Sequence, residues 1–183
     1  PKEDYGERYD GRGRLLMPGL VNAHSHAAMT LLRGYAENLA LDDWLNTRVF
    51  PFEALLTPED IYNGSMLAIA ELLRFGVTSV TDMYFGEDAV CRAALESGIK
   101  INFSSSITCF DESDLKNLPA YRETLPLIRE FHNADDGRIR IDLAIHAEYT
   151  STPKTVAQMA DWARETGLRM HLHLSETRSE HEA

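Results

Sequence analysis

The feature that most constrains the fold is a regular alternation of strand-like and helix-like segments, with a glycine before most of the strands. The glycines Gly76, Gly98, Gly137 and Gly167 each precede a short run rich in β-branched, aliphatic or aromatic residues. The predicted strands cover residues 15–21, 77–85, 99–103, 139–146 and 168–174. A repeat of strand, helix and strand is typical of a parallel sheet covered by helices.

The segments between these strands carry helix signals. Those beginning at Thr57 and Thr152 start with Thr-Pro, which is an N-cap residue followed by a proline at the first helical position. Residues 87–97 form a shorter predicted helix. Residues 115–134 have a helical composition, but two prolines within them are expected to interrupt or kink the helix.

Two architectures fit this order, an open doubly wound sheet and a TIM-type (β/α)8 barrel. A dinucleotide-binding sheet would place G-x-G-x-x-G after the first strand, and this chain has Asn-Ala-His-Ser-His at 22–26 instead. Polar residues also collect at the carboxyl ends of several strands, which favours the barrel. Because a complete barrel takes about 250 residues, the 183 residues should form only about the first five βα units and expose both edge strands.

Composition narrows the class of protein. The chain is 44% hydrophobic and 26% charged, with a formal net charge of −11, which is ordinary for a globular protein and unfavourable for binding nucleic acid. No apolar run is long enough to suggest a membrane partner, and the N-terminus lacks a signal-peptide core. Cys91 and Cys109 are far apart, as free thiols would be in a reducing compartment. We therefore expect a soluble, acidic, cytoplasmic protein without a nucleic acid or membrane partner.

Histidines mark the carboxyl end of the first strand. His24 and His26 alternate along it, so both imidazoles should face the barrel interior. Two neutral imidazoles there can take adjacent positions on a transition metal. The alternative is a pair of polar residues that close a turn.

The fifth and fourth strands end in further polar residues. His171 and His173 share the inward face of the fifth, and Glu176 follows just past its end, where a carboxylate beside an activated water can move a proton. His173 is predicted to be a ligand, whereas His171 is as compatible with a hydrogen-bonded core histidine. His146, the last inward residue of the fourth strand, is predicted to contact the substrate.

Several longer motifs occur in the order found in a known family. They are Met-Pro-Gly-Leu-Val-Asn-Ala-His-Ser-His at 17–26, Asp-Trp-Leu at 43–45, Phe-Pro-Phe-Glu-Ala at 50–54, Leu-Thr-Pro-Glu-Asp at 56–60, Gly-Val-Thr at 76–78, Thr-Asp-Met at 81–83 and the histidine motifs above. Together they make the chain resemble the amidohydrolase superfamily. Within it, the motifs are similar to those of the branch that holds 5-methylthioadenosine/S-adenosylhomocysteine deaminases and related aminohydrolases.

The resemblance implies a metal-dependent hydrolytic deaminase acting on a purine nucleoside. His24, His26 and His173 would hold a divalent metal, zinc first and iron, manganese or nickel as alternatives. An activated water would attack the amine-bearing ring carbon. Glu176 would be the catalytic proton carrier and would also bind the substrate.

The same resemblance assigns three substrate-binding residues. Glu53 would hold the ribose hydroxyls, Trp44 would form a wall of the pocket, and His146 would contact the substrate beside the attacked carbon. Two positions depart from the family pattern. Ser-Ser-Ser at 104–106 stands where an arginine is common, and Glu148 replaces a proline.

The resemblance also predicts the domain organisation. Residues 1–14 would be a remnant of a small β domain, and 15–183 a partial barrel catalytic domain without the later strands and the aspartate that completes the metal site. We expect a homo-oligomer or a complementing C-terminal half as partner. Two alternatives stay open, another amidohydrolase acting on a triazine, guanine or pyrimidine ring, and a truncated non-catalytic fragment.

Overall fold

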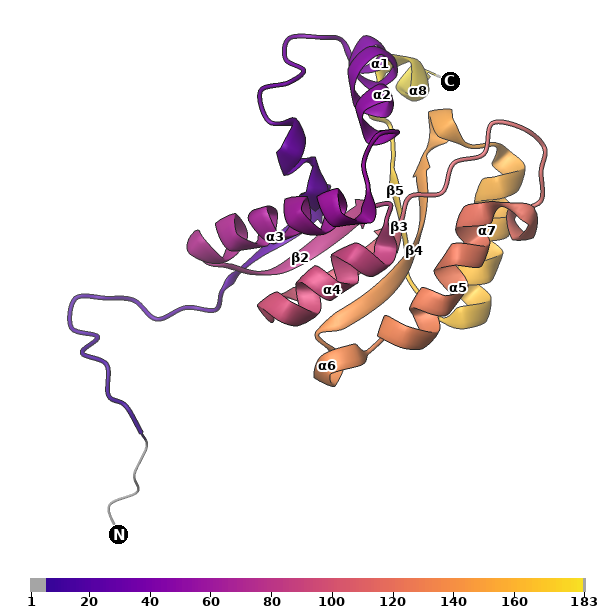
Figure 1. Ribbon diagram of the computed structural model, residues 1–183. Helices are drawn as coiled ribbons and strands as arrows, with labels where there is room; N and C mark the ends of the chain where they lie inside the picture. The colour runs from indigo at the N-terminus through magenta and orange to yellow at the C-terminus, as the bar shows by residue number, and fades with distance from the viewer. Residues whose placement is uncertain (1–5, 183) are drawn as a thin grey trace.

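The computed structural model describes residues 6–182 and contains one sheet of five parallel strands (Figure 1). The strands are β1 (Leu20–Ser25), β2 (Val77–Tyr84), β3 (Lys100–Ser105), β4 (Ile139–Ala147) and β5 (Met170–His173). They lie in chain order, so β1 and β5 form the two edges of the sheet. The sheet curls into part of a barrel, which confirms the predicted class of fold.

Helices connect successive strands and cover the outer face of the sheet. The four long ones are α3 (Pro58–Arg74), α4 (Glu87–Ser97), α5 (Pro119–Phe131) and α7 (Pro153–Thr166). The short helical segments are η1 (Ala27–Leu32), α1 (Leu41–Trp44), η2 (Leu45–Val49), α2 (Phe50–Glu53), η3 (Leu115–Asn117), α6 (Ala134–Gly137), η4 (Glu148–Thr150) and α8 (Arg178–Glu182). In Figure 1, α1, α2 and α8 lie beyond the carboxyl ends of the strands.

Local signals explain where the long helices begin and end. Thr57 and Asp60 form a capping box at the start of α3, in which the Thr57 hydroxyl accepts from the Asp60 backbone N–H. Helix α4 ends at Gly98 and α7 at Gly167, both in the left-handed region that glycine adopts without strain. The predicted helix boundaries at these positions are confirmed.

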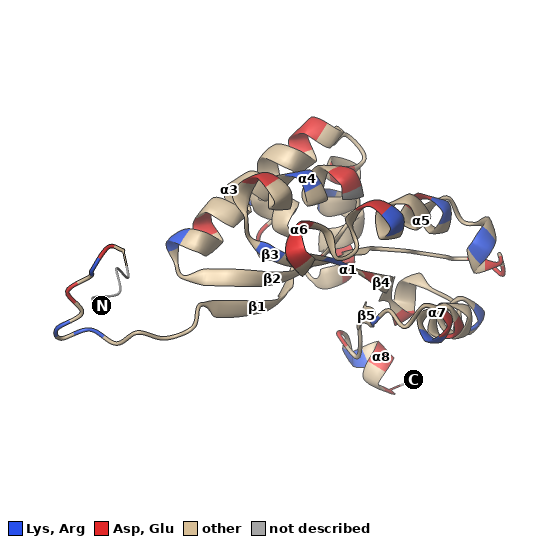
Figure 2. Ribbon diagram, turned by 90° about the horizontal axis from the view of Figure 1, so that it is seen from below, with Lys and Arg blue, Asp and Glu red and all other residues tan. Residues whose placement is uncertain are grey.

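The core lies between the sheet and the long helices. One buried cluster packs β2, β3 and β4 against α3, α4 and α5, and includes the fully buried Phe103. A second joins β4 to α7 around Met159 and Trp162. Lys, Arg, Asp and Glu residues are found mainly on the helices and the N-terminal segment, and few lie on the strands (Figure 2). This arrangement leaves the carboxyl ends of the strands free to carry the site.

Two expectations about elements were wrong in detail. The first strand begins at Leu20 rather than 15, because Pro18 has no N–H to donate and pairing starts at Leu20 with Val77. Leu15 and Leu16 are 85% and 98% exposed. In the segment after β3, helical structure stops at Asn117 and resumes in α5 at Pro119, so an interruption does fall at the first proline. The second proline, Pro126, does not end α5, which continues to Phe131.

The predicted remnant of a small β domain falls partly on residues 1–5, which lie outside the described residues. Residues 6–19 form no strand and contain one turn. They extend away from the sheet in Figure 1. The boundary at residue 14 stays a prediction. Within residues 6–182, no helix has the length and apolar character needed to cross a membrane.

Candidate metal and substrate site

Strand β1 presents two imidazoles at its carboxyl end, as its alternation predicts. His24 Nε2 lies 3.2 Å from His26 Nε2. His26 Nδ1 lies 2.6 Å from the Met83 carbonyl oxygen on the neighbouring strand β2. Because a carbonyl oxygen only accepts, His26 carries its proton on Nδ1 and keeps a lone pair on Nε2. A hydrogen bond of this kind orients a metal-binding imidazole.

Strand β5 brings a third imidazole to the same place from the opposite edge of the sheet. The ring centroid of His173 is 4.8 Å from that of His24 and 5.2 Å from that of His26. One nitrogen of each of the three residues lies within 4.8 Å of the others. Neutral imidazole nitrogens are common ligands of zinc and other transition metals, so this donor set fits such an ion.

The surroundings of His24 and His173 favour their neutral forms. Burial and the neighbouring His26 and His171 lower the pKa of His24. Burial, helped by His26, His146 and His24, lowers the pKa of His173 to about 4. An imidazole must be neutral to bind a metal, so these shifts favour binding at neutral pH.

His146 lies beside this group, at the carboxyl end of β4. Its ring centroid is 5.0 Å from that of His173, and its Nδ1 is 3.0 Å from the Thr150 hydroxyl. Thr150 is buried and also accepts from the Ala147 N–H, so it fixes the ring from one side. Burial lowers the pKa of His146 to about 4. A neutral imidazole held in this way can donate to or accept from a bound ligand through its other nitrogen.

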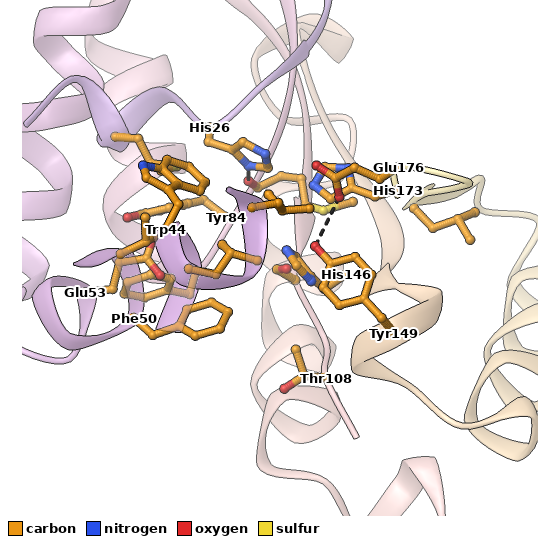
Figure 3. Close-up of a pocket in the computed structure, with 18 of the residues that line it drawn as sticks. His26, Trp44, Phe50, Glu53, Tyr84, Thr108, His146, Tyr149, His173 and Glu176 are labelled. Atoms are coloured by element: carbon orange, nitrogen blue, oxygen red, sulfur yellow. Dashed lines mark hydrogen bonds between the residues drawn. The ribbon is translucent and has the colours of Figure 1, made fainter. Parts of the chain in front are cut away.

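Glu176 follows β5 and faces the same space. Its Oε2 accepts a hydrogen bond of 3.0 Å from the Tyr149 hydroxyl, which orients the carboxylate (Figure 3). Burial and the Glu176 carboxylate raise the pKa of Tyr149, so the phenol stays protonated and continues to donate. Glu176 is therefore a carboxylate of fixed orientation beside the histidines.

These residues line one cavity of about 680 Å³. Helical segments α1 and α2 form its other wall, where Trp44, Phe50 and Glu53 face the histidines (Figure 3). Trp44 is held by a hydrogen bond from its Nε1 to the Ala36 carbonyl oxygen. Burial raises the pKa of Glu53, and the nearby Tyr84 hydroxyl opposes that rise. The cavity thus has an aromatic wall, one carboxylate on each side and the histidines between them.

The structure brings together every residue that the sequence singled out for the site. His24, His26, His173, His146, Glu53, Trp44 and Glu176 all line this cavity. Their individual roles stay predictions. His171 lies next to the group, and its Nε2 is 3.0 Å from His24 Nδ1. This hydrogen bond is compatible with the interpretation of His171 as a hydrogen-bonded core histidine.

Sequence reasoning assigned no role to three residues that shape the site. Tyr149 holds Glu176, Tyr84 adjoins Glu53, and Asp82 accepts a 2.6 Å hydrogen bond from the Ala27 N–H just after His26. Asp82 is completely buried, and burial raises its pKa to about 7. The signal available in the sequence was a single aspartate in an otherwise uncharged strand, at 77–85.

A curled sheet of parallel strands with its polar cavity at their carboxyl ends defines the class of (β/α) barrel proteins. A sequence profile of the amidohydrolase family matches residues 15–183. The chain belongs to the amidohydrolase family.

Relatives and solved structures agree with this assignment. The chain is 43% identical over 170 residues to a 5-methylthioadenosine/S-adenosylhomocysteine deaminase of Dictyoglomus thermophilum, covering 92% of this chain and 39% of the relative. It is 42% identical over 172 residues to a 5'-deoxyadenosine deaminase of Methanothermobacter thermautotrophicus, covering 93% and 40%. A crystal structure of an adenosine deaminase from Xanthomonas campestris with bound zinc superposes with a TM-score of 0.79 at 35% identity, covering 90% of this chain and 37% of that one.

The alignments cover most of this chain but less than half of each relative. The chain spans about two fifths of the length of these relatives. The E. coli guanine deaminase, at 25% identity and a TM-score of 0.74, is covered to 39%. The residues matched by the family profile, 15–183, include the histidine group, Glu53 and Glu176.

Proposed function

We propose that this chain carries the metal-binding and proton-transferring part of a hydrolytic deaminase that acts on a purine nucleoside. The observation that carries the proposal is the cavity in which His24, His26 and His173 converge beside Glu176. The names of the relatives, deaminases of 5-methylthioadenosine, S-adenosylhomocysteine and 5'-deoxyadenosine, support a nucleoside substrate. The zinc in the Xanthomonas campestris structure supports zinc as the metal.

In this proposal each residue of the site has a separate role in the reaction. A divalent metal held by the three imidazoles would supply a water made acidic enough to attack the amine-bearing ring carbon at neutral pH. Glu176, oriented by Tyr149, delivers a proton to the ring nitrogen next to that carbon. His146 contacts the ring from the other side with the nitrogen that Thr150 leaves free.

The wall formed by α1 and α2 binds the rest of the nucleoside. Trp44 and Phe50 offer aromatic surface. The Glu53 carboxylate can accept hydrogen bonds from both hydroxyls of a ribose, which a free base does not have. Glu53 therefore distinguishes nucleosides from bases such as guanine or a triazine.

Substituting Glu176→Gln tests the catalytic assignment. The amide keeps the shape of the side chain but cannot pass on a proton, so turnover of 5-methylthioadenosine should fall by roughly 10²–10⁴-fold. The zinc content should stay at the wild-type level, because Glu176 is not one of the three converging ligands. Ammonia release and metal analysis are the measurements. Glu165→Gln, an exposed change on α7, is the matched control. Turnover retained by the Gln variant would exclude this role for Glu176.

Substituting Glu53→Ala tests the substrate class. We expect a higher KM for ribonucleosides, by about 10-fold or more, because hydrogen bonds to a charged group contribute about 1.5–3 kcal/mol. Steady-state kinetics with a nucleoside and with the corresponding free base provide the comparison within one variant. Equal changes for both substrates would contradict ribose recognition by Glu53. Turnover of the base alone would favour the alternative amidohydrolase reaction.

A further inference from the structure

A continuous chain of hydrogen bonds runs through the imidazoles behind the cavity. It links Met83 O to His26 Nδ1 at 2.6 Å, His26 Nε2 to His24 Nε2 at 3.2 Å, and His24 Nδ1 to His171 Nε2 at 3.0 Å. Each of the last two contacts joins two ring nitrogens, so each holds a single proton. The carbonyl at one end fixes the direction of the chain.

The donor and the acceptor in each of these hydrogen bonds follow from the neutral tautomer of the residue before it. His26 has its proton on Nδ1, so its Nε2 must accept from His24 Nε2–H. A neutral His24 protonated on Nε2 has a lone pair on Nδ1, which accepts from His171 Nε2–H. His171 is then left with a lone pair on Nδ1. In the described part of the chain that Nδ1 is buried and has no hydrogen-bond partner.

A divalent cation requires the opposite arrangement at His24. To offer the lone pair of Nε2, a neutral His24 must carry its proton on Nδ1 and donate it to His171 Nε2. His171 must then accept, with its own proton on Nδ1. We propose that His171 is a positioning residue of the metal site, and that its tautomer switches when His24 becomes a ligand. This inference rests on the ligand assignment in the proposed function.

The protons balance without a change in the charge of the imidazoles. His24 Nε2 releases one proton to solvent, the proton of His171 Nε2 passes to His24 Nδ1, and His171 Nδ1 takes one up. Burial lowers the pKa of His171, which keeps this imidazole neutral, and the Asp142 carboxylate on β4 opposes that shift. Asp142 is itself held 3.1 Å from Arg169. An apolar residue at 171 could support neither tautomer of His24.

The tautomers can be observed directly by nitrogen NMR of protein labelled at histidine, with and without zinc. Two-bond nitrogen–proton correlations distinguish a protonated ring nitrogen from one with a lone pair. We expect the proton of His171 on Nε2 without zinc and on Nδ1 with zinc, the signals being assigned by their loss in His171→Gln. A His171 that keeps one tautomer while zinc binds His24 would overturn this inference and leave the proposed function intact. An absence of zinc binding would overturn both.

Zinc affinity, measured by competition with a chelator, gives a second readout. Loss of an outer partner of a metal-binding histidine typically costs 10–100-fold in affinity, and we expect this range for His171→Leu. His171→Gln should bind close to wild type, because its amide can either donate or accept. His181→Leu, on α8, is the matched control. A Leu variant with wild-type affinity would overturn the proposal, and circular dichroism establishes that the variants are folded.

Discussion

Asp82 links strand β2 to the end of β1, where the first two histidines lie. Its Oδ1 accepts from the Ala27 N–H, directly after His26, while the following Met83 carbonyl accepts from the His26 ring. Two adjacent residues of β2 therefore hold both the backbone and the side chain at this strand end. The other oxygen, Oδ2, is buried and has no hydrogen-bond partner among the described residues.

This burial predicts a pH-dependent effect of Asp82→Asn. Burial raises the pKa of Asp82 from 3.8 to about 7, so the folded chain binds this proton more tightly than the unfolded chain does. The stabilisation that the protonated Asp82 gives the wild-type protein is therefore present at low pH and is lost as the pH rises from about 4 to about 7. The neutral Asn variant has no such loss.

Denaturant unfolding of the two metal-free proteins at pH 5 and pH 8 measures this effect. The free energy of unfolding of the Asn variant, minus that of wild type, should be larger at pH 8 by at least about 1.4 kcal/mol, the equivalent of one pKa unit. Histidine titration affects both proteins and cancels in the difference. A difference that does not change with pH would contradict the raised pKa.

At the residue scale, the sequence predicted the histidines better than their partners. His24, His26 and His173 could be found because alternate residues of a strand face the same side, and strand ends are recognisable. The contact of Tyr149 with Glu176 spans 27 positions and depends on how a loop turns after β4. No periodicity encodes such a contact, so Tyr149 was missed.

Among the elements, η1 and α3 pack closely against each other near the site. Segment η1 begins one residue after His26, and the Thr30 hydroxyl donates to the Gly64 carbonyl oxygen on α3 at 2.8 Å. A Cβ added at Gly64 would lie 2.7 Å from the Ala28 carbonyl oxygen. Gly64 thus allows α3 to approach the segment that follows the metal-binding histidines.

Substituting Gly64→Ala should lower the stability of the protein in spite of alanine's higher helix propensity. Overpacking of a buried contact typically costs about 1–3 kcal/mol, which exceeds the gain of about 1 kcal/mol from replacing a helical glycine. Thermal and denaturant unfolding are the measurements. Asn63→Ala, at the adjacent exposed position, is the control and should be neutral or stabilising. A stabilised Gly64 variant would show that η1 moves freely.

The elements themselves were largely predictable. Glycines that end helices in the left-handed region and Thr-Pro starts gave the boundaries of α3, α4 and α7 within a few residues. The start of β1 was misplaced because hydrophobicity extends back to residue 15, whereas hydrogen bonding to β2 begins at Leu20. Local composition does not report where a partner strand begins.

For the whole molecule, the main feature is that β1 and β5 each pair with one strand only among the described residues. On β1, Leu20 and Val21 are 51% and 68% exposed. An exposed, apolar edge strand favours pairing with another strand. We expect this edge to be covered by a second copy or by the complementary part of a barrel.

Substituting Val21→Lys tests this expectation in the 183-residue chain. A charged side chain on an edge strand disfavours strand pairing, so the variant should associate less than wild type. Sedimentation velocity at several concentrations is the measurement. Leu67→Lys adds the same charge on the exposed face of α3, at 45% exposure, and should leave association unchanged. An equal effect of the two substitutions would point to net charge rather than to the edge.

The histidine group also has a consequence for how the chain folds. The contact between His24 and His171 joins positions 147 residues apart, from the first strand of the sheet to the fifth. Closing so long a loop costs more conformational entropy than any pairing of neighbouring strands, and slow folding accompanies such distant contacts. We therefore expect the curled sheet to assemble before the imidazoles meet. Because the group joins β1 to β5, detachment of either edge strand separates its members.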